Sequence, residues 1–438
     1  MIRSIIISAT LLIATIHNVS GQMKDSTMPS ATLQNCVQYA LAKQPVVQQA
    51  LLDEEITERQ IKAKLADWYP QVNFAYNFQR NFQLQQSVIN GQLIKFGVDN
   101  TSAGQFVLNQ TIFNKDVLLA RRSAKDVRTQ SQQNTVNNKI STTVSVSKAF
   151  YDVLLTTQQI DLLTDDIVRL KQSLKDATSQ YKAGIVDKTD YKRATIALNN
   201  SQAQKKSAEE GLKAKYAYLK EQMGYPADSI LKLQYDTTAM EKDAFVDTLQ
   251  VVTYQNRIEF QQLQTAKKLQ EDNLKYYKWS YIPSVSAFAQ YNYNFQSNKF
   301  AELYNQTYPS SFGGFNIAWP IFQGTKRTQQ VKQAELQLKR VDYDFISLKN
   351  AISSQFTQAM AGYKSSLASY AALKENLELA QDVYNTIQLQ YKSGVKAYLE
   401  VITAESDLRS AEINYINALY QLLSSKLDVQ QALGTIQY

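Results

Sequence analysis

The segment that decides the fold runs from Val285 to Phe295 and reads VSAFAQYNYNF. Apolar and aromatic side chains occupy its odd-numbered positions, whereas most of its even-numbered positions carry Ser, Gln or Asn. This period of two predicts a β-strand with one apolar face and one polar face. Such a strand fits a wall between lipid and water, and its length meets the roughly 9–11 residues that a tilted membrane crossing needs.

Three further segments complete two β-hairpins. Apolar residues alternate with polar ones after Pro70, and they alternate again in the returning strand from Phe315 to Ile321. The counterpart of that returning strand, at 104–113, is less regular. We therefore place the two hairpins at about 70–113 and about 283–322.

A sequence repeat divides the chain into two copies of one plan, because three short motifs recur in the same order at nearly one offset. They are YKAGIV at 181–186 with YKSGVK at 391–396, WYPQV at 68–72 with YIPSV at 281–285, and IFN at 112–114 with IFQ at 321–323. These matches predict an internal duplication. The first repeat then spans 22–245, including a connecting segment at its end, and the second spans 246–438.

Two long segments predict helices that are far longer than a bilayer is thick. No proline or glycine occurs from Asn114 to Tyr181, and the matching segment from Gly324 to Tyr391 contains only Gly362 in its interior. At about 1.5 Å per residue, each helix would extend roughly 100 Å. We expect each to fold back into a second helix, which gives long helix hairpins at about 114–224 and about 324–434.

Apolar and small residues also repeat at alternating spacings of three and four along the last helix, from Val401 to Ala432. This is the spacing of a coiled-coil seam. A solitary soluble helical bundle would explain the seam equally well, so the strands decide between the two interpretations. We predict an α+β membrane protein in which a β-barrel continues into a long coiled-coil helical barrel.

The first residues predict export from the cytoplasm. Arg3 precedes a short apolar run, and the small residues from Val19 to Gly21 are those that a signal peptidase favours. We place a signal peptide at 1–21, with an uncleaved anchor as the alternative. No later stretch has the roughly 18 consecutive apolar residues of a transmembrane helix.

The composition excludes several kinds of chemistry. Removal of the signal peptide takes away His17, the only histidine, and leaves Cys36 as the only cysteine. A mature chain of this kind has no histidine triad, His/Cys zinc site or thiol–histidine pair. We expect no enzyme activity, no cofactor and no metal site. The net charge of +8 is mild for 438 residues and is not clustered, so we expect no nucleic-acid binding.

All three tryptophans, Trp68, Trp279 and Trp319, lie within a few residues of a predicted strand–helix junction. Membrane barrels place aromatic girdles at the level of the lipid headgroups. We therefore expect these side chains to contact lipid at the membrane interface. The alternative is that the rings simply pack the junction, and both can hold at once.

Four strands are too few to close a barrel. Two chains would supply eight, but the interior of an eight-stranded barrel is filled by its own side chains. Three chains, which would supply twelve strands, are the smallest solution with an open interior. We therefore expect a homotrimer with a twelve-stranded β-barrel.

The chain resembles the TolC-like outer-membrane efflux duct family over nearly all of its mature length. The residues that carry this resemblance are LQNCVQYAL at 33–41 followed by Pro45, the Tyr-Lys-x-Gly turns at Gly184 and Gly394, and QQALG at 430–434. The resemblance implies a trimeric barrel in the outer membrane of a Gram-negative bacterium. It also implies a helical tunnel that extends into the periplasm.

The resemblance further implies a duct that performs no chemistry. A periplasmic adaptor (membrane fusion) protein and an inner-membrane pump of the RND or ABC type would dock to it, and small toxic molecules or drugs would pass through it passively. Ducts for type I protein secretion or for metal-ion efflux share the fold and remain alternatives. A stand-alone porin is disfavoured by the long polar helices, and a structural periplasmic coiled coil is disfavoured by the aromatic strands.

The resemblance places four residues at the tunnel entrance. Asp190 and Tyr391 match an aspartate and a tyrosine that link the inner and outer coils of the family, and Lys396 stands where one member has an arginine. Glu400 would form an acidic ring, whereas Thr403 occupies the position of the second ring. The alternatives are that Asp190 charges the start of a helix and that Glu400 is one more solvated acid.

The resemblance also suggests that the adaptor meets the apolar tips of the two helix hairpins. Glycine permits the tight left-handed turn that such a tip needs. The expected tip residues are Gly184, Ile185, Val186, Gly394 and Val395.

Overall fold

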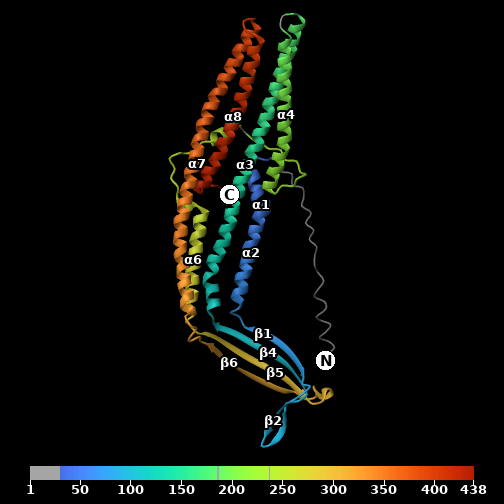
Figure 1. Ribbon diagram of the computed structural model, residues 1–438, viewed down its shortest axis with the longest axis vertical. Coiled ribbons are helices and arrows are strands. Elements are labelled where there is room, and N and C mark those ends of the chain that lie inside the picture. Colours follow the sequence, from blue (N-terminus) through green and yellow to red (C-terminus); the bar gives the residue numbers. More distant parts are fainter. Residues whose placement is uncertain (1–29, 185–186, 236) are drawn as a thin grey trace.

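The structure of the protein is a computed structural model, and it describes residues 30–184, 187–235 and 237–438. The expected signal peptide at 1–21 and the expected tip residues Ile185 and Val186 lie outside the described residues. Figure 1 shows an elongated molecule, with a β-sheet at one end and long helices that run away from it.

Four antiparallel strands form the main sheet in the order β1-β4-β5-β6. Their bounds are β1 (Gln71–Arg80), β4 (Asn100–Phe113), β5 (Ser284–Ser297) and β6 (Tyr308–Ala318). The central strands β4 and β5 come from different halves of the chain and pair directly. β1 and β6 are the edges, so each leaves a row of backbone groups unpaired within the described part of the chain.

The register collects the alternating residues of the strands on two contrasting faces. Phe74 pairs with Phe106, which pairs with Tyr291 on its other side. The ring centroids of Phe74 and Phe106 lie 4.8 Å apart. Gln105, which precedes Phe106 in β4, belongs to the opposite face and pairs with Asn292. One face is therefore aromatic and the other is rich in Asn and Gln, as the alternation in the sequence predicts.

The returning strand β6 ends at Ala318, although the sequence pattern predicts a strand that continues to Ile321. Pro320 has no backbone N–H to donate to a neighbouring strand, so the pairing stops before it. The Trp319 indole donates a hydrogen bond to the Tyr281 carbonyl oxygen over 3.2 Å instead.

A two-stranded hairpin, which the sequence pattern did not predict, extends beyond the main sheet (Figure 1). It consists of β2 (Gln85–Ile89) and β3 (Gln92–Phe96). The φ angles of the turn residues are 50° at Asn90 and 79° at Gly91, and two positive values are what a type I′ turn requires. All residues of both strands are exposed.

Helices form the rest of the molecule. In the first half, α1 (Leu33–Lys43) and α2 (Pro45–Ala66) precede the sheet, and α3 (Lys115–Lys182) and α4 (Lys188–Met223) follow it. In the second half, α5 (Thr237–Asp243) and α6 (Ile258–Trp279) come before β5, and α7 (Lys326–Lys392) and α8 (Tyr398–Leu433) come after β6. In the described ranges, no helix combines the length and the hydropathy needed to cross a membrane.

The helices pack as two hairpins that lie side by side. α3 packs along α4, α7 packs along α8, and α3 also contacts α8. The predicted coiled-coil seam of α8 is buried, since Leu408, Leu422 and Val429 are each at most 1 % exposed. The main apolar core lies where α1, α3, α4, α7 and α8 meet, and Tyr363 is its largest fully buried side chain.

Glycines end α4 and α8 where another segment comes very close. Gly434 has a φ of 72°, and a Cβ there would lie 2.7 Å from the Asn256 carbonyl oxygen. Gly224 has a φ of 65°, and its Cβ would lie 2.9 Å from the Lys43 carbonyl oxygen. No side chain fits at either position, so these glycines let α4 and α8 end directly against their neighbours.

Candidate functional site

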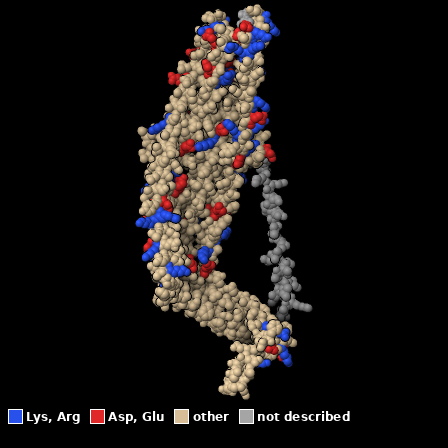
Figure 2. All heavy atoms as spheres, in the orientation of Figure 1, with Lys and Arg blue, Asp and Glu red and all other residues tan. Residues whose placement is uncertain are grey.

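The main sheet carries almost no charge. Arg80, the last residue of β1, is the only Lys, Arg, Asp or Glu in the four described strands. Figure 2 shows charged groups on the helices and at the far end of the sheet, with an uncharged band between them. The aromatic face is open in the single chain, and Phe315 on it is 74 % exposed. A broad uncharged aromatic surface is unfavourable in water and favourable against lipid.

The three tryptophans lie where the sheet joins the helices. Trp68 and Trp279 are half-buried, whereas Trp319 is 61 % exposed. The Arg121 guanidinium lies over the Trp68 ring, 5.7 Å from its centroid. Trp68 thus packs the junction, while Trp319 has the exposure that a membrane-interface residue needs.

The two helix hairpins turn at glycines at the end of the molecule opposite the sheet (Figure 1). The φ angles are 72° at Gly184 and 75° at Gly394, in the region that favours glycine. Their N–H groups donate to the carbonyl oxygens of Tyr181 and Tyr391 over 3.0 and 2.9 Å. Val395 follows the second turn and is 71 % exposed. These expected tip residues therefore lie at the free ends of the hairpins.

A hydrogen bond joins the two hairpins just inside the tips. The Tyr391 hydroxyl of α7 donates to the Gln180 side-chain oxygen of α3 over 2.7 Å. The expected partner Asp190 lies nearby on α4. Burial, with Asp176 and Asp190 contributing, raises the pKa of Tyr391 although the bond to Gln180 opposes this shift. Gln180 is therefore the hydrogen-bond partner of Tyr391 in the single chain, and the link through Asp190 that the resemblance implies stays a prediction.

Lys396 and Glu400 form an ion pair with each other. The Lys396 Nζ and Glu400 Oε2 atoms lie 2.6 Å apart, and the two side chains, four residues from each other along the chain, are 37 % and 42 % exposed. A surface pair of this kind contributes only about 0–1 kcal/mol to stability. Lys396 thus engages its own hairpin rather than the α3–α4 hairpin.

A small aromatic layer also connects the hairpins at this level. Tyr398 of α8 is 3 % exposed and packs against Ala177 of α3 and Ala194 of α4. The Tyr391 ring lies 5.7 Å from the Tyr398 ring, and Tyr191 joins the same cluster. Apolar packing together with the Tyr391–Gln180 hydrogen bond therefore holds the tip ends of the two hairpins together.

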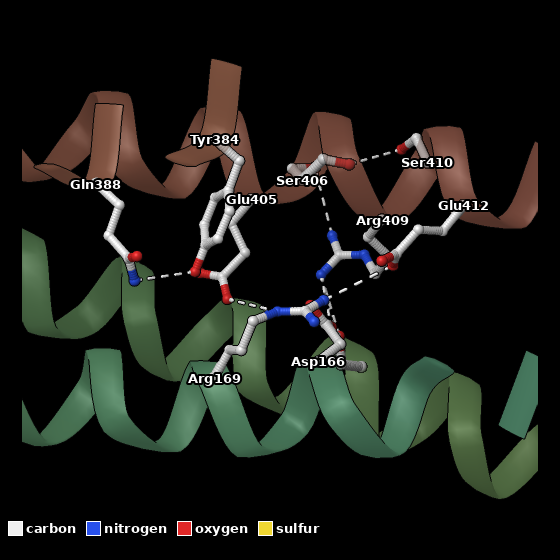
Figure 3. Close-up of polar contacts among 10 residues, drawn as sticks. Asp166, Arg169, Tyr384, Gln388, Glu405, Ser406, Arg409, Ser410 and Glu412 are labelled. Atoms are coloured by element: carbon white, nitrogen blue, oxygen red, sulfur yellow. Dashed lines mark hydrogen bonds and ion pairs between the residues drawn. The ribbon is translucent and has the colours of Figure 1, made fainter. Parts of the chain in front are cut away.

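A buried charged cluster, which the sequence did not reveal, lies deeper between the hairpins (Figure 3). Asp166 of α3 is fully buried and contacts Arg409 of α8, with 3.1 Å between Oδ2 and Nη1. Ser201 of α4 donates to the same carboxylate over 2.6 Å. Arg169 of α3 lies between Asp166 and Glu405 of α8. The pattern contained no signal for it, because charged residues on a long helix ordinarily face water.

Among the described residues, no group of three or more His, Cys, Asp or Glu side chains is arranged to hold a metal ion.

Known proteins resemble this chain over most of its length. The model of the Outer membrane efflux protein family matches residues 36–225 and 251–435. Outer membrane protein TolC of Escherichia coli strain K12 is 20 % identical over 94 % of this chain and 84 % of the relative. Alkaline protease secretion protein AprF of Pseudomonas aeruginosa is 20 % identical over 88 % of this chain and 81 % of the relative.

Solved structures share the fold. A membrane protein from Pseudomonas aeruginosa superposes with a TM-score of 0.75 at 18 % identity and covers 92 % of both chains. CusC superposes with a TM-score of 0.74 at 14 % identity, over 92 % of this chain and 91 % of CusC. VceC from Vibrio cholerae gives a TM-score of 0.73 at 13 % identity, over 92 % of this chain and 96 % of VceC. These matches confirm the predicted fold class of a sheet that continues into long helices.

Proposed function

Because the chain belongs to the outer membrane efflux protein family, we propose that it forms the outer-membrane exit duct of a tripartite export system. Small toxic molecules or drugs pass through it passively from the periplasm-spanning pump to the exterior. We assign no catalytic step and no cofactor to it.

One observation carries this proposal, namely the direct continuation of a nearly uncharged amphipathic sheet into very long polar helices. β4 ends at Phe113 and α3 begins at Lys115, and α3 has 68 residues. At about 1.5 Å per residue, α3 extends roughly 100 Å from the sheet. A wall that suits lipid at one end and water along the rest supports a duct that reaches from the outer membrane into the periplasm.

The assembly belongs to the proposal as well. The free edges of β1 and β6 would pair between neighbouring chains, and three chains would close a twelve-stranded barrel. The two repeats at 22–245 and 246–438 would then contribute one hairpin of the main sheet and one helix hairpin each. A native mass in detergent that corresponds to a single chain would contradict the trimer.

The proposed partners are an adaptor protein, an inner-membrane pump of the RND or ABC type, and the lipid of the outer membrane. The adaptor would contact the exposed tips at Gly184, Gly394 and Val395. Type I protein secretion is the second candidate function, because the relative AprF is named an alkaline protease secretion protein.

A deletion strain tests the function. We expect increased sensitivity to toxic small molecules, and plasmid-borne wild-type protein should restore resistance. Normal drug resistance together with loss of a secreted protein would favour the secretion duct instead. A stand-alone porin would conduct without an adaptor and pump, so deletion of those partners would leave its transport unchanged.

A further inference from the structure

The buried charged cluster connects the two helix hairpins a short way inside the entrance. Asp166 and Arg169 belong to α3, Ser201 belongs to α4, and Glu405, Arg409 and Glu412 belong to α8. Glu405 is seven residues from the first residue of α8, which is about 10 Å along the helix axis. Any movement that separates the α3–α4 hairpin from the α7–α8 hairpin near the entrance must therefore break this cluster.

Asp166 uses the best polar contacts in the cluster. Its Oδ2 atom accepts hydrogen bonds from the Ser201 hydroxyl over 2.6 Å and from Arg409 Nη1 over 3.1 Å. Its Oδ1 atom accepts from Arg169 Nη2 over 3.4 Å. Both arginines thus commit a nitrogen atom to one carboxylate, which is 0 % exposed and well satisfied.

Glu405 is left without such contacts. Its side chain is 2 % exposed, and neither carboxylate oxygen has a hydrogen-bond partner among the described residues. The nearest guanidinium atom, Arg169 Nε, lies 3.8 Å from Glu405 Oε1, which is too far for a hydrogen bond. Arg169 Nη2 lies similarly far, at 3.7 Å, from the third acid, Glu412. The carboxylates of Asp166, Glu405 and Glu412 therefore share two guanidinium groups. Glu405 has the poorest polar contacts of the three.

The surroundings of Glu405 include groups from every helix packed against it. α3 presents Asp166 and Arg169, and α8 itself presents Arg409 and Glu412. α7 presents the Tyr384 ring, which Figure 3 places beside Glu405, and α4 contributes the uncharged Ser201. Burial, reinforced by Asp166 and opposed by Arg169 and Arg409, raises the pKa of Glu405 to about 7.

We propose that Glu405 is the proton-binding switch of a clamp that holds the two helix hairpins together near the entrance. With its proton bound, Glu405 is neutral and the cluster is balanced, with two carboxylates facing two guanidinium groups. Without the proton, an unpaired carboxylate is buried at the contact between α3 and α8. Separation of the hairpins hydrates that carboxylate, so loss of the proton favours separation. The clamp rests on the proposed duct function only in that separation of the hairpins is taken to open the entrance.

The sign of the pH effect follows from the pKa. The packed state binds the proton more tightly than a hydrated glutamate with its ordinary pKa of 4.5, because the pKa is about 7 when the cluster is packed. Packing is therefore favoured at acidic pH and loses this advantage as the pH rises through 7. Between about pH 5.5 and about pH 8, the ratio of packed to separated hairpins should fall by up to about 30-fold.

The proposed clamp is tested by measuring the distance between two spin labels near the tips with pulsed electron–electron double resonance. Lys188 of α4 and Lys392 of α7 are exposed, so Lys188→Cys with Lys392→Cys supplies one label on each hairpin. The native Cys36 is fully buried and its pKa is raised to about 12, so it should remain unlabelled. The double-cysteine chain is co-expressed with an excess of wild-type chain and then spin-labelled. Distances are measured in detergent from pH 5.5 to pH 8.

The packed hairpins should give a shorter distance between the two labels than the separated hairpins. In the labelled chain with no other change, this shorter distance should disappear as the pH rises, with a midpoint near pH 7. Glu405→Gln should keep the shorter distance at every pH. The matched control Asp407→Asn, an exposed acid two residues farther along α8, should behave like wild type. Arg169→Gln removes a cation that lowers the Glu405 pKa, so it should move the midpoint to a higher pH.

The clamp is disproved if Glu405→Gln responds to pH as wild type does, or if the wild-type distance does not change. Ion conduction after reconstitution tests the proposed duct function independently of the clamp. A distance that depends on Glu405 in a chain that conducts no ions would support the clamp and contradict the duct.

Discussion

The Tyr391 hydroxyl of α7 donates a hydrogen bond to the Gln180 side-chain oxygen of α3 over 2.7 Å. These residues lie 211 positions apart in the chain, and their bond joins the ends of the two helix hairpins. Because the bond lies inside the proposed entrance, its strength should influence how readily the entrance opens.

Replacement of Gln180 by Ala should raise the single-channel conductance of the reconstituted protein. Loss of one hydrogen bond weakens the contact by about 1 kcal/mol, which corresponds to roughly a fivefold change in the ratio of closed to open entrances. The Gln172→Ala variant is the control, because Gln172 bonds to Asp176 within α3. The structure further predicts a larger effect for Gln180→Ala than for Asp190→Ala, and the reverse order would restore Asp190 as the partner.

Replacement of Lys396 by Gln should leave the conductance nearly unchanged. Lys396 pairs with Glu400 in its own hairpin, and an exposed pair contributes only about 0–1 kcal/mol. A rise in conductance as large as that of Gln180→Ala would show that Lys396 reaches across to the other hairpin.

Replacement of Val395 by Glu should abolish co-purification with the adaptor protein. Val395 is 71 % exposed at a hairpin tip, and a buried unpaired carboxylate at an apolar contact is strongly unfavourable. Val383→Glu supplies the control, because Val383 is also an exposed valine of the same hairpin but lies on the shaft of α7. If Val395→Glu still binds the adaptor, the docking surface does not lie at the tips.

Replacement of Phe106 by Lys should prevent stable insertion into the outer membrane, whereas Gln105→Lys should insert normally. These neighbours in β4 lie on opposite faces, and a lysine facing lipid costs about 2–4 kcal/mol near the bilayer midplane. Membrane fractionation measures insertion, and the reversal potential should shift toward anion selectivity for Gln105→Lys. Equal insertion of both variants would contradict the assignment of the aromatic face to lipid.

Replacement of Gly434 by Ala should lower stability by about 1–3 kcal/mol, because Ala is strained at positive φ. Its Cβ would also lie 2.7 Å from the Asn256 carbonyl oxygen. Gly362→Ala is the matched change inside α7, where a Cβ meets nothing within 4 Å. It should instead stabilise the helix by about 0.5–1 kcal/mol. Denaturation followed by circular dichroism should show midpoints that move in opposite directions.

The sequence predicts the regular parts of this fold because those parts depend on local patterns. Alternation over 285–295 yields β5, and the absence of proline and glycine after Asn114 yields α3. The β2–β3 hairpin carries an Asn90–Gly91 turn between apolar residues. An Asn-Gly pair in this setting predicts a hairpin, whereas the alternation that predicts the main strands does not.

The polar contacts between hairpins could not be predicted in the same way. Gln180 and Tyr391 meet only because two long helices adopt a particular relative register, and no local pattern encodes that register. Asp166 and Glu405 look like solvated charges in the sequence, since nothing in a charged helix reveals which acid its neighbour will bury.

The arm formed by β2 and β3 has every strand residue exposed, and its mirror position in the second half holds only the short loop around Phe300–Glu302. Exposed side chains are under little structural constraint, so substitutions in this arm should be tolerated easily. If the protein forms an outer-membrane duct, the arm points toward the outside world and offers antibodies and phages their most variable target. An epitope inserted between Asn90 and Gly91 should accordingly be detectable on intact cells.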